Sequence, residues 1–209
     1  MAKLIKLQED VPLLGLLHIG IIDRGSTLLQ VRSTTVCNMR CQFCSTAAND
    51  NKVHPYNFQV TPNHINTWID EAIRLKKNNV TEINIDSVGE PTADKDVHKI
   101  IEHVKTVPSI QTVSMQTNGT LLTKQKINQY NDARLDRLNI SIHSLDEKQS
   151  KELFGNETYS ITKIHEALEY LKETNIKVNI TPVWLPQINE KEIPKLIQIS
   201  KDINATIAI

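Results

Sequence analysis

All three cysteines of this 209-residue chain lie within eight residues, as Cys37, Cys41 and Cys44. Their spacing is Cys-x3-Cys-x2-Cys, and an aromatic residue, Phe43, precedes the last of them. Thiolates are soft ligands that suit iron–sulfur clusters and zinc. Three of them on one short loop leave a fourth ligand position open, which is typical of a reactive metal site rather than a closed structural one. The spacing therefore predicts a three-thiolate centre with an open position.

The same cysteines have a second interpretation, a zinc site completed by a histidine such as His54. Zinc sites usually pair ligands from two separate loops, whereas these cysteines share one loop, so the pattern favours iron and sulfide. An odd number of closely spaced cysteines does not suit a disulfide framework and indicates a reducing compartment. We therefore expect a cytoplasmic protein.

Charge and hydropathy narrow the classes of partner. Lys plus Arg and Asp plus Glu both number 24, so the sequence gives no basic footprint for nucleic acid. The apolar stretch at residues 11–22 is too short to span a membrane and lacks the basic leader of a signal peptide. We expect no membrane association, and we expect this stretch to form a strand or hairpin packed on the main domain.

Strand and helix patterns alternate along the rest of the chain. The predicted strands are 28–32, 82–86, 110–116, 137–142, 176–184 and 205–209. Helices are predicted from Pro62, over 94–107 and 124–132, from the Ser144–Glu147 capping box, over 159–173, and over 193–201 after a second box at Asn189–Glu192. Residues 45–57 read as a polar loop. This alternation implies parallel strands joined by right-handed crossovers, whose carboxyl ends should bring the strand-end motifs together.

Several of those motifs resemble the radical S-adenosylmethionine (radical SAM) superfamily. Its loop after the first strand carries Cys-x3-Cys-x2-Cys with an aromatic residue before the last cysteine, as here. Val88-Gly89-Glu90-Pro91 is similar to its Gly-Gly-Glu-Pro motif, with Val88 in place of the first glycine. Segments 117–119 and 139–146 resemble the MoaA, NifB and PqqE branch of the family.

The resemblance implies a set of cofactors and contacts. The three cysteines would hold a [4Fe–4S] cluster whose open iron binds the amino and carboxylate groups of SAM. Gly89 and Glu90 would hold the methionine end, and Phe43 would lie by the adenine. Ser141 and His143 would lie near the ribose; the alternative for His143 is a strand-end histidine that points at solvent.

For the fold, the resemblance implies α/β architecture: an incomplete parallel (βα)6 barrel, or partial TIM barrel. Residues 28–209 would form the radical SAM core domain, and residues 1–27 an N-terminal strand or hairpin extension. The core is then either a fragment truncated at its C-terminus or a barrel closed by a partner or by the substrate. With no further cysteine, the chain supplies no cysteine ligands to an auxiliary cluster.

For the activity, the resemblance implies an enzyme that uses an external one-electron donor of the flavodoxin or ferredoxin type. SAM would be cleaved reductively to methionine and a 5′-deoxyadenosyl radical, which abstracts hydrogen from a substrate that the sequence does not identify. One alternative is a non-catalytic iron–sulfur or zinc module for binding or electron transfer. Another is an RNA-modifying radical SAM enzyme lacking its RNA-binding domain, which the neutral charge does not support.

Overall fold

The main element of the fold is a seven-stranded sheet in the order β2-β3-β5-β6-β7-β8-β9. The computed structural model describes residues 3–8, 11–46 and 56–209. The strands of this sheet are β2 (Gly20–Asp23), β3 (Leu28–Arg32), β5 (Glu82–Ile85), β6 (Thr112–Thr117), β7 (Arg137–Ile140), β8 (Lys177–Ile180) and β9 (Thr206–Ile207). Neighbours from β3 to β9 pair in parallel, and β2 pairs antiparallel to β3. The six predicted parallel strands are therefore confirmed, with shorter bounds in several cases.

A second, two-stranded sheet was not predicted. It pairs β1 (Lys3–Leu7) in parallel with β4 (Tyr56–Val60). The prediction of a polar loop over residues 45–57 is wrong for its last two residues, which begin β4. The first 27 residues contribute to both sheets, because β1 lies in the small sheet and β2 lies at the edge of the large one. The strand expected within residues 11–22 thus corresponds to the start of β2.

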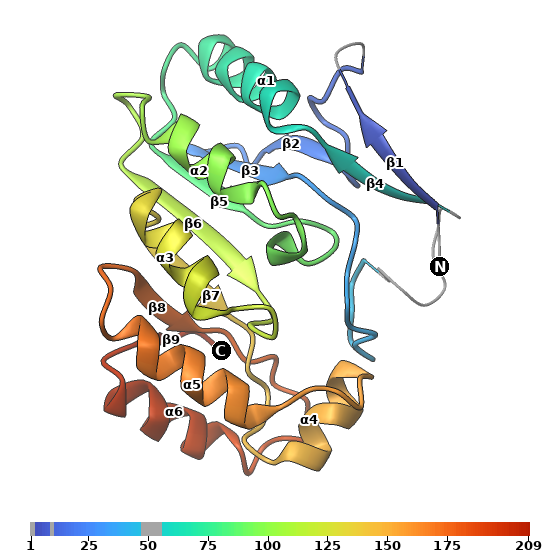
Figure 1. Cartoon of the computed structure of the whole chain (residues 1–209), viewed down its shortest axis with the longest axis vertical. Coiled ribbons are helices and arrows are strands. Elements are labelled where there is room, and N and C mark those ends of the chain that lie inside the picture. Colours follow the sequence, from blue (N-terminus) through green and yellow to red (C-terminus); the bar gives the residue numbers. More distant parts are fainter. Residues whose placement is uncertain (1–2, 9–10, 47–55) are drawn as a thin grey trace.

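The helices cover one face of the large sheet. Their bounds are α1 (Pro62–Leu75), α2 (Val97–Val104), α3 (Lys124–Asp132), α4 (Glu147–Phe154), α5 (Ile161–Leu171) and α6 (Ile193–Asp202), with a short 3-10 helix, η1 (Pro91–Ala93). Figure 1 shows α1, α2, α3, α5 and α6 following one another along this face, while α4 stands apart, beside the loop that follows β3. In the part of the chain that the structure describes, no helix has the length and hydropathy needed to cross a membrane.

The parallel strands alternate between an apolar face and a polar one. Ile83, Val113 and Leu138 are fully or almost fully buried in the hydrophobic core, together with residues of the covering helices. The intervening positions carry polar side chains that form hydrogen bonds across strands. Ser114 Oγ donates to Asn84 Oδ1 at 3.1 Å, and Asn179 Nδ2 on β8 donates to Asn139 Oδ1 on β7 at 3.2 Å. A parallel sheet covered on both faces usually has near-continuous apolar strands. The polar face therefore marks the side of the sheet that a polar ligand can approach.

A helix begins at each predicted capping box, but the cap residues differ from the pattern. The N-cap of α4 is Asp146, whose Oδ1 accepts the Gln149 N–H at 2.7 Å, and not Ser144. The N-cap position of α6 is Glu192, and not Asn189. In both cases the polar side chain of the pattern is occupied elsewhere, because Ser144 Oγ accepts the Asp146 N–H and Asn189 bonds loop backbone groups.

Candidate functional site

One cavity lies at the carboxyl ends of the parallel strands and has a volume of about 560 Å³. Its lining comes from the loop after β3, the turn after β5 and the ends of β6, β7 and β8. All eight residues predicted from the sequence line it: Cys37, Cys41, Phe43, Cys44, Gly89, Glu90, Ser141 and His143. Motifs more than a hundred positions apart in the chain are therefore brought together as expected for this edge of a parallel sheet.

The cysteine loop is attached to the C-terminus of α4. The Arg40 N–H donates to the Phe154 carbonyl at 2.8 Å, and the Gln42 N–H donates to the Leu153 carbonyl at 3.2 Å. These bonds satisfy carbonyl groups that a helix end leaves without an intrahelical partner. Gly155 ends the helix in the left-handed region, and a Cβ there would collide with the Arg40 carbonyl. The helix end and the loop are thus built as one unit.

A second attachment joins the loop to the turn after β5. The Glu90 N–H donates to the Val36 carbonyl at 2.7 Å, and the Gly89 N–H donates to the Thr34 carbonyl at 3.3 Å. A Cβ on Gly89 would collide with the backbone at Val36, so glycine is needed here for close backbone approach and not for a positive φ. Val88 does not have a positive φ, so valine in place of the family's first glycine is compatible with this turn.

The Glu90 carboxylate is buried and accepts hydrogen bonds from four protein groups. Its Oε1 accepts from the Thr92 N–H (3.0 Å), the Thr92 hydroxyl (2.6 Å) and the Thr117 hydroxyl (2.6 Å). Its Oε2 accepts from the Asn118 N–H at 2.7 Å. The Asn118 side chain in turn donates to Asn38 Oδ1 in the cysteine loop at 2.9 Å. Glu90 therefore holds the turn after β5 and the end of β6 in a fixed relation to the loop.

The thiols face a low-dielectric surrounding. Burial, followed by nearby negative groups, raises the pKa of Cys37 to about 11 and that of Cys41 to about 12. Both thiols are protonated at neutral pH, and metal binding has to displace those protons. Among the described residues, no group of three His, Cys, Asp or Glu side chains forms a ready site for a single metal ion. A four-iron cluster binds each thiolate through a different iron, so three soft sulfur donors around one cavity fit it better than they fit zinc. His54 lies outside the described residues.

His143 is buried, so the alternative of a solvent-facing histidine is wrong. Its ring packs edge-on against Phe43, with ring centroids 4.6 Å apart, and beside Phe154 at 4.8 Å. Burial lowers the pKa of His143 to about 4, so the ring is neutral at physiological pH. The ring is part of the cavity wall and gives that wall a neutral hydrogen-bonding group.

Sequence reasoning missed several further lining residues, among them Asp86, Gln116, Phe154 and Val183. Asp86 directly follows β5, and burial raises its pKa. Gln116 Nε2 donates to Ser141 Oγ at 3.0 Å and to Thr181 Oγ1 at 2.9 Å, and thereby holds three strand ends together. The signal that identifies Asp86 and Gln116 is their place at strand carboxyl ends, whereas Phe154 reaches the cavity only through the contact of α4 with the loop.

Residues 31–199 match the family model described as the Radical SAM superfamily. This chain belongs to the radical SAM superfamily. The cofactors of that superfamily are a [4Fe–4S] cluster and SAM, as the cysteine spacing and the motif resemblance predicted.

Two relatives illustrate where this radical SAM protein lies within the family. It is 34% identical to an uncharacterised protein of Methanocaldococcus jannaschii over 207 residues, which is 96% of this chain and 47% of the relative. It is 26% identical to GTP 3′,8-cyclase of Aquifex aeolicus over 186 residues, which is 89% of this chain and 56% of the relative. The chain thus spans about half the length of the curated relatives it matches.

Solved structures show the same fold. The crystal structure of Streptococcus suis SuiB bound to S-adenosylmethionine superposes with a TM-score of 0.67 at 21% identity, over 86% of this chain and 39% of SuiB. This radical SAM protein therefore has the α/β fold with a parallel sheet found in radical SAM enzymes.

Proposed function

We propose that this radical SAM protein binds a [4Fe–4S] cluster through Cys37, Cys41 and Cys44 and binds SAM in the same cavity. When bound, these cofactors supply a 5′-deoxyadenosyl radical through one-electron reductive cleavage of SAM, and this radical takes a hydrogen atom from the substrate. The observation that carries the proposal is that the cysteine loop and the motifs after β5, β6 and β7 line a single cavity.

The residues of the chain bind and orient in this scheme. The Gly89–Glu90 turn lies along the methionine end of SAM, and Phe43 lies beside the adenine. Ser141 and His143 contact the ribose. The four hydrogen bonds of the buried Glu90 carboxylate join the turn after β5 to the end of β6, and Asn118 links that end to Asn38 of the cysteine loop. Such positioning is the protein's share in cofactor chemistry.

The fold, partners and substrate follow as parts of the same proposal. The sheet is an incomplete (βα)6 barrel, with residues 28–209 as its core and 1–27 as an extension that adds strands. The electron donor is a flavodoxin or ferredoxin in the cytoplasm. The substrate is a polar molecule that approaches from the polar face of the sheet, where burying the side chains of Asn84, Asn139 and Asn179 under an apolar molecule would be costly. GTP is a first compound to test, because a relative is named GTP 3′,8-cyclase.

Anaerobic reconstitution tests the proposal. The protein is supplied with iron and sulfide, and then with SAM and dithionite. We expect about four irons per chain and the formation of 5′-deoxyadenosine. Cys41→Ala should lose both, whereas Ser45→Ala, on an exposed neighbour in the same loop, should lose neither. A full cluster without 5′-deoxyadenosine would support the alternative of a non-catalytic electron-transfer module and refute the enzyme.

A further inference from the structure

The position of the proton on His143 follows from one hydrogen bond. The Val183 N–H donates to His143 Nδ1 at 3.0 Å. A ring nitrogen that accepts a hydrogen bond carries a lone pair, so the proton of the neutral imidazole is on Nε2. His143 lines the cavity. The ring can therefore offer Nε2–H as a donor to an acceptor oxygen of a bound molecule.

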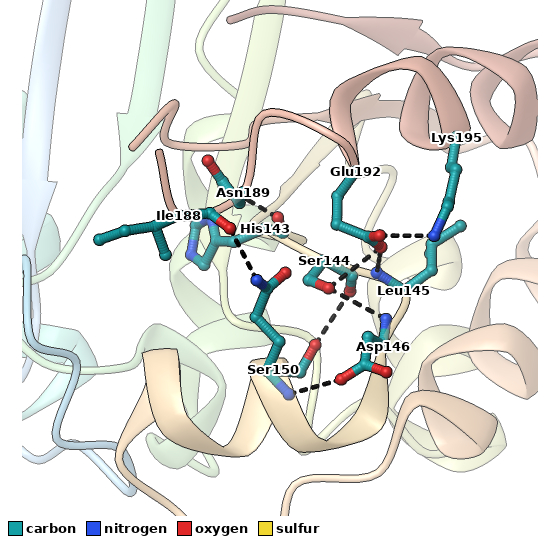
Figure 2. A network of polar contacts seen from close by, with 10 residues as sticks. His143, Ser144, Leu145, Asp146, Ser150, Ile188, Asn189, Glu192 and Lys195 are labelled. Atoms are coloured by element: carbon teal, nitrogen blue, oxygen red, sulfur yellow. Dashed lines mark hydrogen bonds and ion pairs between the residues drawn. The ribbon is translucent and has the colours of Figure 1, made fainter. Parts of the chain in front are cut away.

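Asn189 forms hydrogen bonds with the backbone carbonyls of both residues, His143 and Val183. Its Nδ2 donates to the His143 carbonyl at 2.9 Å and to the Val183 carbonyl at 2.8 Å. Its Oδ1 accepts the Leu185 N–H at 2.8 Å. The side chain is fully buried, so losing any of these bonds leaves a backbone group without a partner. Figure 2 shows Asn189 reaching from the segment before α6 to the backbone at His143.

Other contacts hold the neighbouring backbone independently of Asn189. Glu192 Oε2 accepts from the Ser144 hydroxyl at 3.1 Å and from the Leu145 N–H at 2.8 Å, and Ser150 Oγ donates to the Ser144 carbonyl at 2.9 Å (Figure 2). None of these bonds involves Val183 or the His143 ring. The loop after β7 thus keeps its anchors when Asn189 is changed, and Ser150, which is also fully buried, provides a matched control.

We propose that Asn189 is a positioning residue that holds Val183 against His143 and so presents the Nε2–H of His143 as a fixed hydrogen-bond donor at the cavity wall. The acceptor it fits is an oxygen with a free lone pair, such as a ribose hydroxyl. That this oxygen belongs to SAM rests on the proposed function, whereas the fixed tautomer is a property of the chain alone.

Nitrogen-15 NMR of the imidazole groups in the metal-free protein tests the tautomer without any cofactor. The His143 signals are assigned by their absence from His143→Gln. We expect the Nε2–H tautomer in the wild type and in Ser150→Ala. Asn189→Asp keeps an acceptor for Leu185 but cannot donate to the two carbonyls, so it should show mixed tautomers. A wild-type tautomer pattern in Asn189→Asp, or an Nδ1–H tautomer in the wild type, would overturn the proposal.

A second variant covers the case in which Asn189→Asp does not fold. Val183→Pro, at an exposed side chain, removes the N–H that His143 accepts and fixes φ at residue 183, and it should also give mixed tautomers. In the reconstituted protein, either variant should weaken SAM binding about tenfold, which corresponds to one hydrogen bond, while Ser150→Ala changes it less than about twofold. If SAM affinity fell equally in Ser150→Ala, Asn189→Asp and Val183→Pro, Asn189 would have only a structural role. That result would refute the positioning role even where wild-type SAM cleavage supports the proposed function.

Discussion

Replacing Glu90 by glutamine should weaken the fold itself. The carboxylate has two acceptor oxygens, and both face donors, with three hydrogen bonds on Oε1 and one on Oε2. A glutamine can place its oxygen toward Thr92 and Thr117, but its NH2 group then points at the Asn118 N–H. One charge-assisted bond is lost, and two donors oppose each other in a buried site.

The magnitude follows from those bonds. A hydrogen bond to a charged group contributes roughly 1.5–3 kcal/mol, and a buried donor without an acceptor costs about 1–3 kcal/mol. Part of each value describes the same lost contact, so we expect Glu90→Gln to lower the free energy of unfolding by about 2–4 kcal/mol. That is a large share of the roughly 5–15 kcal/mol by which proteins are stable.

Urea unfolding of the metal-free protein, followed by far-UV circular dichroism, measures this loss. Thr117→Val, which removes one donor to Glu90 and the acceptor of the Gly119 N–H, should give a loss in the same direction. Glu71→Gln changes an exposed carboxylate paired with Arg74 and should leave the midpoint nearly unchanged. If Glu90→Gln unfolds at the wild-type midpoint while SAM binding is lost, Glu90 is a ligand and not a brace, and the reasoning fails.

Three further perturbations test other parts of the site. Gly89→Ala should lower cluster content per folded chain several-fold, because its Cβ collides with Val36, whereas Gly20→Ala, which also collides with backbone but away from the cavity, should affect only stability. The pKa of His143 is about 4 in the folded state against an ordinary 6.5, so the unfolded state binds more protons between these values. Lowering the pH from 6.5 to 4 should therefore reduce the free energy of unfolding of the wild type by up to about 3 kcal/mol, a loss that His143→Gln should not show. Alkylation of Cys37 and Cys41 in the metal-free protein should be slow at pH 8 and rise about tenfold per pH unit up to their raised pKa values.

Each of these three predictions has an outcome that would contradict it. Normal cluster content in Gly89→Ala would mean that the turn can move away from Val36 at little cost. Parallel pH profiles of the wild type and His143→Gln would show that the ring is not buried as described. Rapid alkylation at pH 8 would show that the thiols are more exposed than the structure has them.

The parallel strands and most helices could be predicted because their signals are local. Alternating apolar residues identify a strand such as Glu82–Ile85, and a threonine–proline pair identifies the start of α1. The cysteine loop was recognisable because its three cysteines lie within eight residues. The pairing of β1 with β4 was not predictable, since the two strands lie about fifty residues apart and neither has a clear buried face.

The roles of single polar residues were harder to predict, because their partners are distant in sequence. Glu90 bonds Thr117 and Asn118, 27 and 28 positions away, so its pattern suggested only a ligand or a turn residue. Asn189 has the spacing of a capping box, yet its bonds reach back 46 positions to His143. A local pattern cannot distinguish these uses, because each depends on which strand ends meet in space.

The bonds between the cysteine loop and α4 bear on how a cofactor would be assembled. Residues 38–42 are held by helix carbonyls and by Asn156, whose Nδ2 donates to the Asn38 carbonyl at 2.9 Å. Ordering a residue costs about 1–2 kcal/mol in backbone entropy, so these five residues correspond to about 5–10 kcal/mol that folding of the metal-free chain has already supplied. Cluster insertion then meets a preorganised loop, and its rate should depend on delivery of iron and sulfide and on loss of the thiol protons rather than on a conformational search.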